Sequence, residues 1–245
     1  MLITSINNKH IKEINKLKEK KYRDESDCFL VETKHLVLEA YKAGLLKELI
    51  LEKNEIFPLD VETVYVTKEI LKKISSIDSP SNVMALVSKR KEEHYLGEKI
   101  LILDKIQDPG NLGAIIRSAV AFDITNIICS KDTVDVYNPK VVRASQGMIF
   151  HIPIMYTNIK KTIQELKQND YKIIGTKVTN GHDVKTSSIY SHFALVIGNE
   201  GQGISKEIDE LCDEYLYIKM NEKCESLNAS VAASILLYEI NNKYN

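Results

Sequence analysis

The sequence lacks any apolar run that approaches the ~20 residues needed to span a bilayer, which argues against a membrane protein. The Lys-rich start from Met1 to Lys21 has no apolar core segment, so we expect no secretory signal. The 4 cysteines and the 6 histidines are scattered, without a CxxC pair or a Cys/His cluster at zinc spacing. These absences predict a cytoplasmic protein with reduced cysteines, bound to no membrane and to no metal.

The common nucleotide-binding motifs are also missing. The sequence contains no GxxxxGK[ST] loop, which argues against nucleotide triphosphate hydrolysis. Its late glycine cluster, Gly198, Gly201 and Gly203, does not fit GxGxxG and does not follow the first strand, so a dinucleotide site is disfavoured. The formal net charge of −1 argues neither for nor against a nucleic-acid partner.

The first hundred residues have the pattern of a small α/β unit. Apolar spacing predicts helices around residues 11–17 and 36–45, and short apolar runs predict strands at 49–51, 64–66 and 83–87. The following stretch, 88–93, carries no apolar residue. It predicts a boundary near residues 89–97, between domains at 1–95 and 96–245.

The rest of the chain alternates strands with helices. Apolar runs predict strands at residues 100–103, 127–129, 173–175, 194–198 and 215–218. Periodic segments predict helices at 112–120, after Asn138-Pro139, and from Leu227 to Ile240. This alternation is typical of an α/β fold with a mostly parallel sheet.

A basic segment lies near the start of the chain, with seven cationic and two anionic residues between Lys9 and Arg23. It is either a phosphate-binding face or an ordinary solvated helix face.

Polar loops follow predicted strands at residues 108–113, 198–203 and 225–228, where parallel sheets gather ligands. The glycines of 198–203 either admit a ligand or form a tight turn, after which Ser205 caps a helix. Arg117 lies off the apolar stripe of its helix. Arg143, Ser145 and Gly147 form a further polar cluster.

Three segments carry a resemblance to a known family. Ile106–Ala119, Leu195–Gly203 and Ser226–Ala233 resemble, in order, the three motifs of the SpoU/TrmH branch of SPOUT RNA methyltransferases. Residues 3–9 and Phe29–Glu32 are similar to the small substrate-binding domain of the rRNA-modifying members. The resemblance therefore spans nearly the whole chain.

The resemblance implies a small N-terminal α/β RNA-binding domain followed by a SPOUT α/β domain with a C-terminal trefoil knot. It implies transfer of a methyl group from S-adenosyl-L-methionine to a ribose 2′-hydroxyl of RNA, with rRNA favoured. It also implies a homodimer with the RNA site at the subunit boundary. A tRNA 2′-O-methyltransferase and a non-catalytic RNA-binding relative remain the alternatives.

The resemblance also implies the site residues. Those expected to hold the cofactor are Thr176, Gly198, Asn199, Gly201, Ile218, Met220, Leu227 and Asn228. Those expected to take part in catalysis are Arg117, Asn111, Glu200, Ser226 and Asn228. Arg117 is either a general base or a group that stabilises a phosphate or an alkoxide, since a guanidinium normally stays charged. Ser226 either touches the nucleotide or caps the last helix.

Some positions depart from the family pattern. Thr33 stands where Gly is common after Val-Glu, and Asp123 replaces a frequent Gly. Ser81-Asn82 stands in place of Gln-Gly, and Lys219 in place of Pro. The positions at 33 and 81–82 bear on RNA docking, whereas Lys219 leaves a cofactor contact through the backbone possible.

Overall fold

The computed structural model describes residues 1–91, 96–188 and 190–244. The contacts divide the chain into two compact units. The first contains residues 1–91 and 135–150, and the second contains the remaining described residues. The predicted boundary between residues 95 and 96 falls at the edge of 92–95, which lie outside the described residues.

The first unit is built on a five-stranded sheet in the order β1-β4-β3-β5-β2. Strand β5 runs antiparallel to β3 and β2, whereas β1, β4 and β3 are parallel. The strands are β1 (Leu2–Ile3), β2 (Cys28–Glu32), β3 (Leu46–Glu52), β4 (Thr63–Val66) and β5 (Val83–Ser88). The helices are α1 (Lys9–Lys16), α2 (Lys20–Ser26), α3 (Lys34–Lys42), α4 (Lys68–Ile74), α6 (Pro139–Ala144) and the 3-10 turn η1 (Met148–Phe150).

One core of this unit lies between the sheet and the helices α1 and α4. Ile11 and Ile14 of α1 and Ile70 of α4 pack with Ile50 and Val64 of the sheet. The i, i+3 spacing of Ile11 and Ile14 places both side chains on one helical face, as the sequence predicts. Burial of that face holds a helix whose other residues are mostly charged.

Residues 135–150 belong to the first unit although the sequence assigns them to the second domain. The aromatic ring of Phe29 lies 4.7 Å from that of Tyr137 and 6.1 Å from that of Phe150, between ring centroids. Arg23, which is 3% exposed, forms an ion pair of 2.6 Å with Asp135. Periodicity does not reveal this grouping, because long-range packing decides which core a short segment joins.

The ion pair removes one residue, Arg23, from the cations that the basic segment Lys9–Arg23 can offer to RNA, and the six lysines stay exposed. The guanidinium of Arg23 donates to the backbone oxygens of Leu17 and Lys18 as well as to Asp135. Such a buried, fully paired cation serves the fold and offers no charge to RNA.

Two departures from the family pattern fall on left-handed backbone. Thr33 has a φ of 98° and Asp123 a φ of 55°. A β-branched residue at such a φ is strained, whereas glycine adopts it freely. The glycine that is common at each position therefore has a conformational reason.

We expect Thr33→Gly to raise the free energy of unfolding by about 1 kcal/mol, because relief of backbone strain outweighs the lost helix cap and the greater freedom of the unfolded chain. The lost cap is weak, since the Thr33 hydroxyl accepts from the Leu36 amide at 3.4 Å. Urea unfolding measures the change. The matched control is Thr67→Gly, since Thr67 also precedes a helix but has a φ of −81°. If both variants changed the free energy of unfolding equally, backbone strain at Thr33 would not be the cause.

The second unit is built on a seven-stranded sheet in the order β10-β12-β9-β11-β6-β7-β8. Every neighbouring pair is parallel. The strands are β6 (Lys99–Leu103), β7 (Asn126–Ser130), β8 (Ile154–Thr157), β9 (Lys172–Thr176), β10 (His182–Asp183), β11 (Phe193–Ile197) and β12 (Glu214–Tyr217). The helices are α5 (Pro109–Ala121), α7 (Ile159–Gln168), α8 (Lys206–Asp209) and α9 (Ala229–Asn241).

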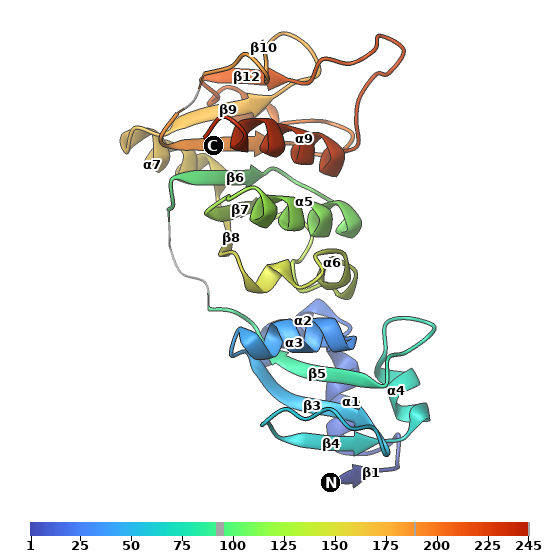
Figure 1. Cartoon of the computed structure of the whole chain (residues 1–245). Helices are drawn as coiled ribbons and strands as arrows, with labels where there is room; N and C mark the ends of the chain where they lie inside the picture. The colour runs from blue at the N-terminus through green and yellow to red at the C-terminus, as the bar shows by residue number, and fades with distance from the viewer. Residues whose placement is uncertain (92–95, 189, 245) are drawn as a thin grey trace. The chain divides into compact units, whose positions relative to one another are not determined.

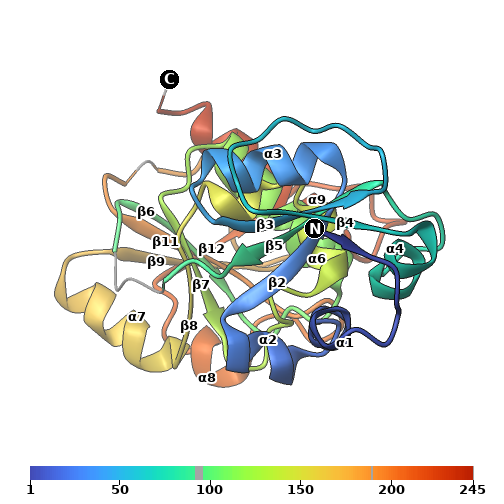
Figure 2. The same cartoon turned by 90° about the horizontal axis from the view of Figure 1, so that it is seen from below.

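Helices cover both faces of this sheet (Figures 1 and 2). Ile163 of α7 and Ile208 of α8 pack against Ile100 and Ile102 of β6 on one face. Helices α5 and α9 lie side by side on the other face, where the Ser118 and Ser234 hydroxyls are 2.7 Å apart. Because both faces are covered, central strands such as β6 and β11 are apolar without alternation.

The α/β class and the parallel sheet predicted from the sequence are confirmed. The runs at 100–103, 127–129 and 194–198 match β6, β7 and β11 closely. The sequence did not predict β8, α4 or α7 as elements. Ser205 is the N-cap residue of α8, as the sequence suggests, but its hydroxyl makes no capping hydrogen bond among the described residues. None of the described helices is long and apolar enough to cross a bilayer.

Candidate functional site

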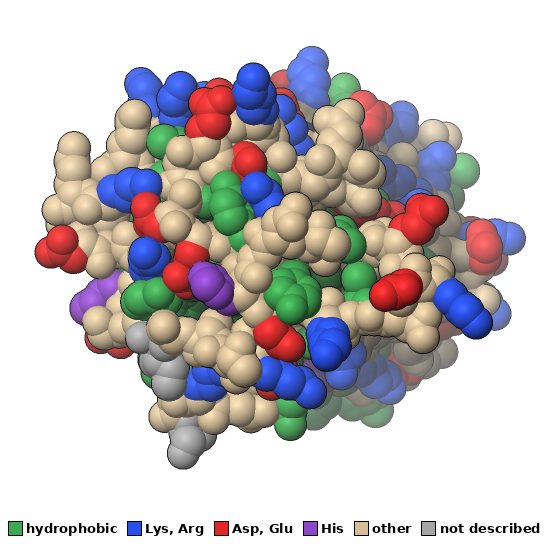
Figure 3. All heavy atoms as spheres, turned by 90° about the horizontal axis from the view of Figure 1, so that it is seen from above, with side chains coloured by type: hydrophobic (Ala, Val, Ile, Leu, Met, Phe, Trp, Pro, Cys, Tyr) green, Lys and Arg blue, Asp and Glu red, His purple; other side chains and the backbone are tan. Residues whose placement is uncertain are grey.

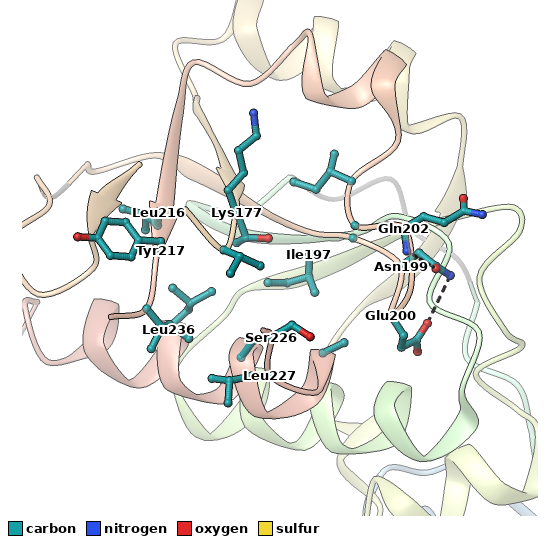
Figure 4. Close-up of a pocket in the computed structure, with 18 of the residues that line it drawn as sticks. Lys177, Ile197, Asn199, Glu200, Gln202, Leu216, Tyr217, Ser226, Leu227 and Leu236 are labelled. Carbon is teal, nitrogen blue, oxygen red and sulfur yellow. Dashed lines mark hydrogen bonds between the residues drawn. The ribbon is translucent and has the colours of Figure 1, made fainter. Parts of the chain in front are cut away.

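The second unit contains a cavity of about 460 Å³ at the carboxyl ends of β9, β11 and β12 (Figure 4). Strand β9 ends at Thr176, β11 leads into the loop 198–204, and β12 leads into the segment that starts α9. A parallel sheet brings these ends to one edge because all of its strands point the same way. The lining residues are Thr176, Lys177, Val178, Ile197, Gly198, Asn199, Glu200, Gly201, Gln202, Gly203, Ile204, Asp209, Leu216, Tyr217, Ile218, Met220, Ser226, Leu227, Ala229, Ala232 and Leu236.

The loop 198–204 turns back sharply against itself. The amide and carbonyl groups of Asn199 pair with those of Gly203. A Cβ atom on Gly198 would lie 2.1 Å from the carbonyl carbon of Gly203 and 2.2 Å from the amide nitrogen of Ile204. No side chain fits at position 198, so glycine is required there by space.

The Asn199 side chain holds the tip of this loop. Its Oδ1 accepts from the amides of Gly201 and Gln202 at 2.9 and 3.1 Å. Its Nδ2 donates to the carbonyl of Lys105 at 2.8 Å. The loop is therefore tied to the segment after β6, and its backbone is preorganised on the cavity side.

The cavity has an apolar part and a polar edge. Ile197, Leu216, Leu227 and Leu236 gather around it in Figure 4. At the edge the ammonium of Lys177 lies 3.2 Å from the carboxylate of Asp209. Such a pocket suits a ligand with a flat apolar ring and a polar tail.

A network of side-chain hydrogen bonds joins the three predicted loops. Asn111 at the start of α5 donates through Nδ2 to Glu200 at 3.0 Å. Asn228, the N-cap of α9, donates through Nδ2 to the Oδ1 of Asn111 at 2.9 Å. The Oδ1 of Asn228 accepts from the Ser230 amide at 2.9 Å. The loops at 108–113, 198–203 and 225–228 thus form one assembly.

Both carboxylate oxygens of Glu200 are used as acceptors. Oε1 accepts from the Asp108 amide and from Asn111, and Oε2 accepts from the Gln107 amide and from Asn199. Partial burial raises the pKa of Glu200, but the hydrogen bonds from Asn111 and the backbone amides outweigh it and hold the pKa below 4.5. Glu200 is therefore an ionised group that orders the loops.

We expect Glu200→Gln to weaken binding of a ligand in this cavity about tenfold, because an amide nitrogen would face two donors in either orientation. The depressed pKa means that the carboxylate's contribution to stability is present above pH 4.5 and is lost as the pH falls through the lower pKa of the folded state. Glu200 should stay ionised between about pH 5 and 8, so its titration should not change the affinity of the wild-type protein over that range.

Titration calorimetry at several pH values measures both effects for S-adenosylhomocysteine, the demethylated form of the cofactor that the sequence implies. Glu207→Gln is a matched control, because Glu207 is exposed on α8 and does not line the cavity. Unchanged affinity in Glu200→Gln would show that the carboxylate does not order the loops.

Arg117 lies on α5 and is exposed. It does not line the cavity, and its side chain has no hydrogen bond or ion pair among the described residues. The neighbouring Ser118 faces α9, which leaves the Arg117 side chain to project from the helix pair. The sequence-based expectation that Arg117 lies off the buried stripe is confirmed.

The structure gathers most of the predicted site residues. Those that line the cavity are Thr176, Gly198, Asn199, Glu200, Gly201, Ile218, Met220, Ser226 and Leu227. Asn111 and Asn228 lie beside it through the network with Glu200, and Arg117 stands apart. Sequence reasoning missed Lys177, Asp209 and Tyr217 in the lining. Lys177 was within reach of that reasoning, since it directly follows the end of β9.

The cysteine, histidine and acidic side chains in the described ranges form no cluster that could hold a metal ion. Two known protein families match parts of this chain. Residues 98–238 match the SpoU rRNA methylase family, and residues 8–85 match the MRM3-like substrate binding domain.

Among curated proteins, the 23S rRNA (guanosine(2553)-2′-O)-methyltransferase RlmP of Bacillus subtilis is 35% identical over 243 residues. The match covers 97% of this chain and 98% of that protein.

Solved structures agree with this match. An S-adenosylmethionine-bound rRNA methyltransferase from Sinorhizobium meliloti superposes with a TM-score of 0.89 at 27% identity, covering 100% of this chain and 98% of that one. The SpoU methyltransferase AviRb from Streptomyces viridochromogenes, in complex with the same cofactor, has a TM-score of 0.87 at 24% identity, with coverage of 97% and 98%. The second likeness shows the shared fold.

Proposed function

Because the chain belongs to the SpoU rRNA methylase family, we propose that it methylates a ribose 2′-hydroxyl of 23S rRNA with S-adenosylmethionine as the methyl donor. The observation that carries this proposal is the hydrogen-bond network that joins the three motif loops, two of which line one cavity. Retention of Asn111, Arg117, Glu200 and Asn228 favours an active enzyme over a non-catalytic RNA-binding relative.

The cavity residues fit the cofactor. Gly198 lines the cavity and lets the loop 198–204 close tightly on itself, since a Cβ there would collide with the backbone of Gly203 and Ile204. Ile218 and Leu227 supply apolar walls for an adenine ring. Thr176, Asn199, Gly201 and Met220 complete the proposed cofactor residues, and Asn228 supports them through Asn111.

S-adenosylmethionine supplies an electrophilic methyl group. A ribose 2′-hydroxyl is a poor nucleophile, so its proton must pass to the adjacent phosphate or to water as the oxygen attacks. We assign Arg117 the role of a fixed cation that binds the adjacent phosphate and stabilises the developing alkoxide, since a guanidinium normally stays charged. Ser226, whose side chain borders the cavity, contacts the target nucleotide. Holding the hydroxyl next to the methyl donor supplies a further part of the acceleration.

We also propose a homodimer formed through α9 and α5. On α9, Val231 is 46% exposed and Tyr238 is 50% exposed, and their i, i+7 spacing places both on one face of the helix. The family resemblance implies that such a contact brings the exposed Arg117 of one subunit near the cavity of the other. An isologous contact of this kind builds two equal composite sites.

The remaining assignments follow from the same proposal. Residues 1–95 bind the RNA, in keeping with the match of residues 8–85 to a substrate-binding domain, and the part of residues 96–245 outside 135–150 carries the chemistry. The trefoil knot of the family forms around the loop 198–204 and the segment before α9. The protein works in the cytoplasm, where rRNA is made and modified.

The experiment that tests this function uses the whole protein, an unmodified 23S rRNA transcript and S-adenosylmethionine labelled in its methyl group. We expect label in rRNA at a nucleotide that becomes resistant to alkaline cleavage, because a 2′-O-methyl group blocks attack by the ribose oxygen. A tRNA pool is the second arm. Label in tRNA alone would replace the substrate assignment, and no label in either RNA would contradict the proposed function.

A further inference from the structure

Net charge does not identify an RNA-binding surface on this protein. The chain has a formal charge of −1, and cationic and anionic side chains are interspersed on the face drawn in Figure 3. Arg23, one of the cations of the basic segment, is buried in an ion pair. The cations that best indicate an RNA-binding surface are therefore those whose position is fixed and whose charge is not neutralised by an acidic partner.

Arg143 of α6 is such a cation. Its Nη1 donates to the Ser76 hydroxyl oxygen at 2.6 Å. No carboxylate pairs with it among the described residues, so most of its N–H donors remain available. Arg143 is not among the residues assigned to cofactor binding or to catalysis.

The Ser76 hydroxyl is itself anchored on a buried carboxylate. It donates to Oε1 of Glu32 at 2.5 Å, and the Ser76 amide donates to the same oxygen at 2.8 Å. The Ser75 hydroxyl donates to Oε2 of Glu32 at 2.6 Å. Glu32 is 3% exposed, so its position at the end of β2 is set by the core. Rigid backbone thus fixes Ser76, and Ser76 orients the guanidinium of Arg143.

Two lysines lie near the same serines. The ammonium of Lys18 donates to the backbone oxygen of Lys73 at 2.7 Å, at the end of α4 next to Ser75. Lys18 interacts electrostatically with Glu32, and the exposed Lys73 adds a second positive charge. Lys18 is thus linked to the Glu32 carboxylate directly and Arg143 through Ser76, and Lys73 lies beside Lys18, so this group carries three positive charges and one negative charge.

We propose that Arg143, together with Lys18 and Lys73, binds a backbone phosphate of the RNA, and that Glu32 acts through Ser76 as a positioning residue. An oriented guanidinium matches a phosphate with two parallel hydrogen bonds, which favours phosphate over a base edge as the ligand. This inference rests on the proposed function only for the identity of the polymer. It assigns the polar cluster around Arg143 to substrate docking.

The test compares equilibrium RNA binding by wild type and variants, using a 23S rRNA transcript and poly(U) over a range of salt concentrations. We expect Arg143→Gln to weaken binding of both RNAs about tenfold and to reduce the salt slope by about one, because a phosphate contact carries no sequence information. Ser76→Ala should weaken both in the same direction; its melting temperature should fall, because Glu32 loses a donor, but a melting curve should show the protein folded at the assay temperature. Arg143→Lys should restore the salt slope but only part of the affinity.

Lys53→Gln is the matched control, because it removes an exposed charge from the same unit whose side chain makes no hydrogen bond or ion pair with Glu32, Ser76 or Arg143 among the described residues. Wild-type binding by Arg143→Gln would overturn the phosphate contact, and wild-type binding by Ser76→Ala would overturn the positioning role. A loss confined to the 23S transcript would show sequence reading and also contradict the proposal. All variants should still bind S-adenosylhomocysteine, so a failure of methyl transfer in wild type is a separate result that bears on the proposed function.

Discussion

Gly198→Ala is expected to abolish detectable binding of S-adenosylhomocysteine, with a loss of at least about 100-fold, or ~3 kcal/mol. The added Cβ would lie 2.1 Å from the carbonyl carbon of Gly203 and 2.5 Å from its oxygen. Backbone atoms do not rotate away as the end of a side chain does, so the loop 198–204 must open. Opening it breaks the Asn199–Gly203 pairing and moves the residues that line the cavity from 198 to 204.

Titration calorimetry on the purified protein measures this loss, and a melting curve shows whether the sheet survives. Gly201→Ala is the matched control in the same loop, because its Cβ would meet only the Asn199 Oδ1, at 3.7 Å. That variant should keep its affinity within about tenfold of wild type. If Gly198→Ala bound the ligand normally, the cavity would not be the cofactor site. If both variants lost binding equally, close approach at position 198 would not be the reason.

Arg117→Ala is expected to lower kcat about 100- to 1,000-fold while leaving cofactor affinity unchanged, because it removes one charged donor from the transition state. The side chain is exposed and does not line the cavity of its own chain. Stability should therefore not change. Arg117→Lys should recover part of the activity if charge is the main contribution.

Mixing the inactive Arg117→Ala and Gly198→Ala proteins tests whether Arg117 serves the partner's site. In a mixed dimer one site would combine an intact cavity with an intact arginine, and the other would carry both defects. Random exchange of equal amounts should then restore about a quarter of the wild-type activity. With exchange verified by a mass tag, no recovery would mean that Arg117 serves its own cavity, and the composite site would be ruled out.

Part of the site could be predicted because its residues lie in short, continuous motifs of the sequence. The order of the three motif segments is a property of the sequence, and polar loops after buried strands point to the carboxyl edge of a parallel sheet. Gly198, Asn199 and Leu227 were therefore expected at one pocket, and they line it. Lys177 and Asp209 were missed because their proximity depends on how β9 and α8 pack.

The role of Glu200 could not be predicted from the sequence. The sequence indicates an acidic residue in a glycine-rich loop, which suits either catalysis or structure. The fold places four donors around its two oxygens, and that arrangement makes it an ordering group. Hydrogen bonds between residues about 90 positions apart leave no trace in local periodicity.

By itself the sequence determined the α/β class, the apolar strands β6, β7 and β11, and the motif residues, because burial on both faces and close backbone approach demand particular side chains at particular positions. Only the tertiary structure decided that residues 135–150 join the first unit, that Arg23 is buried while Arg143 stays available, and that Thr33 sits at a φ of 98°. These outcomes depend on which distant segments share a core. Whether a charged side chain is buried, and which φ a residue adopts, depends on the segments packed around it. The composition and local spacing of the sequence do not specify those segments.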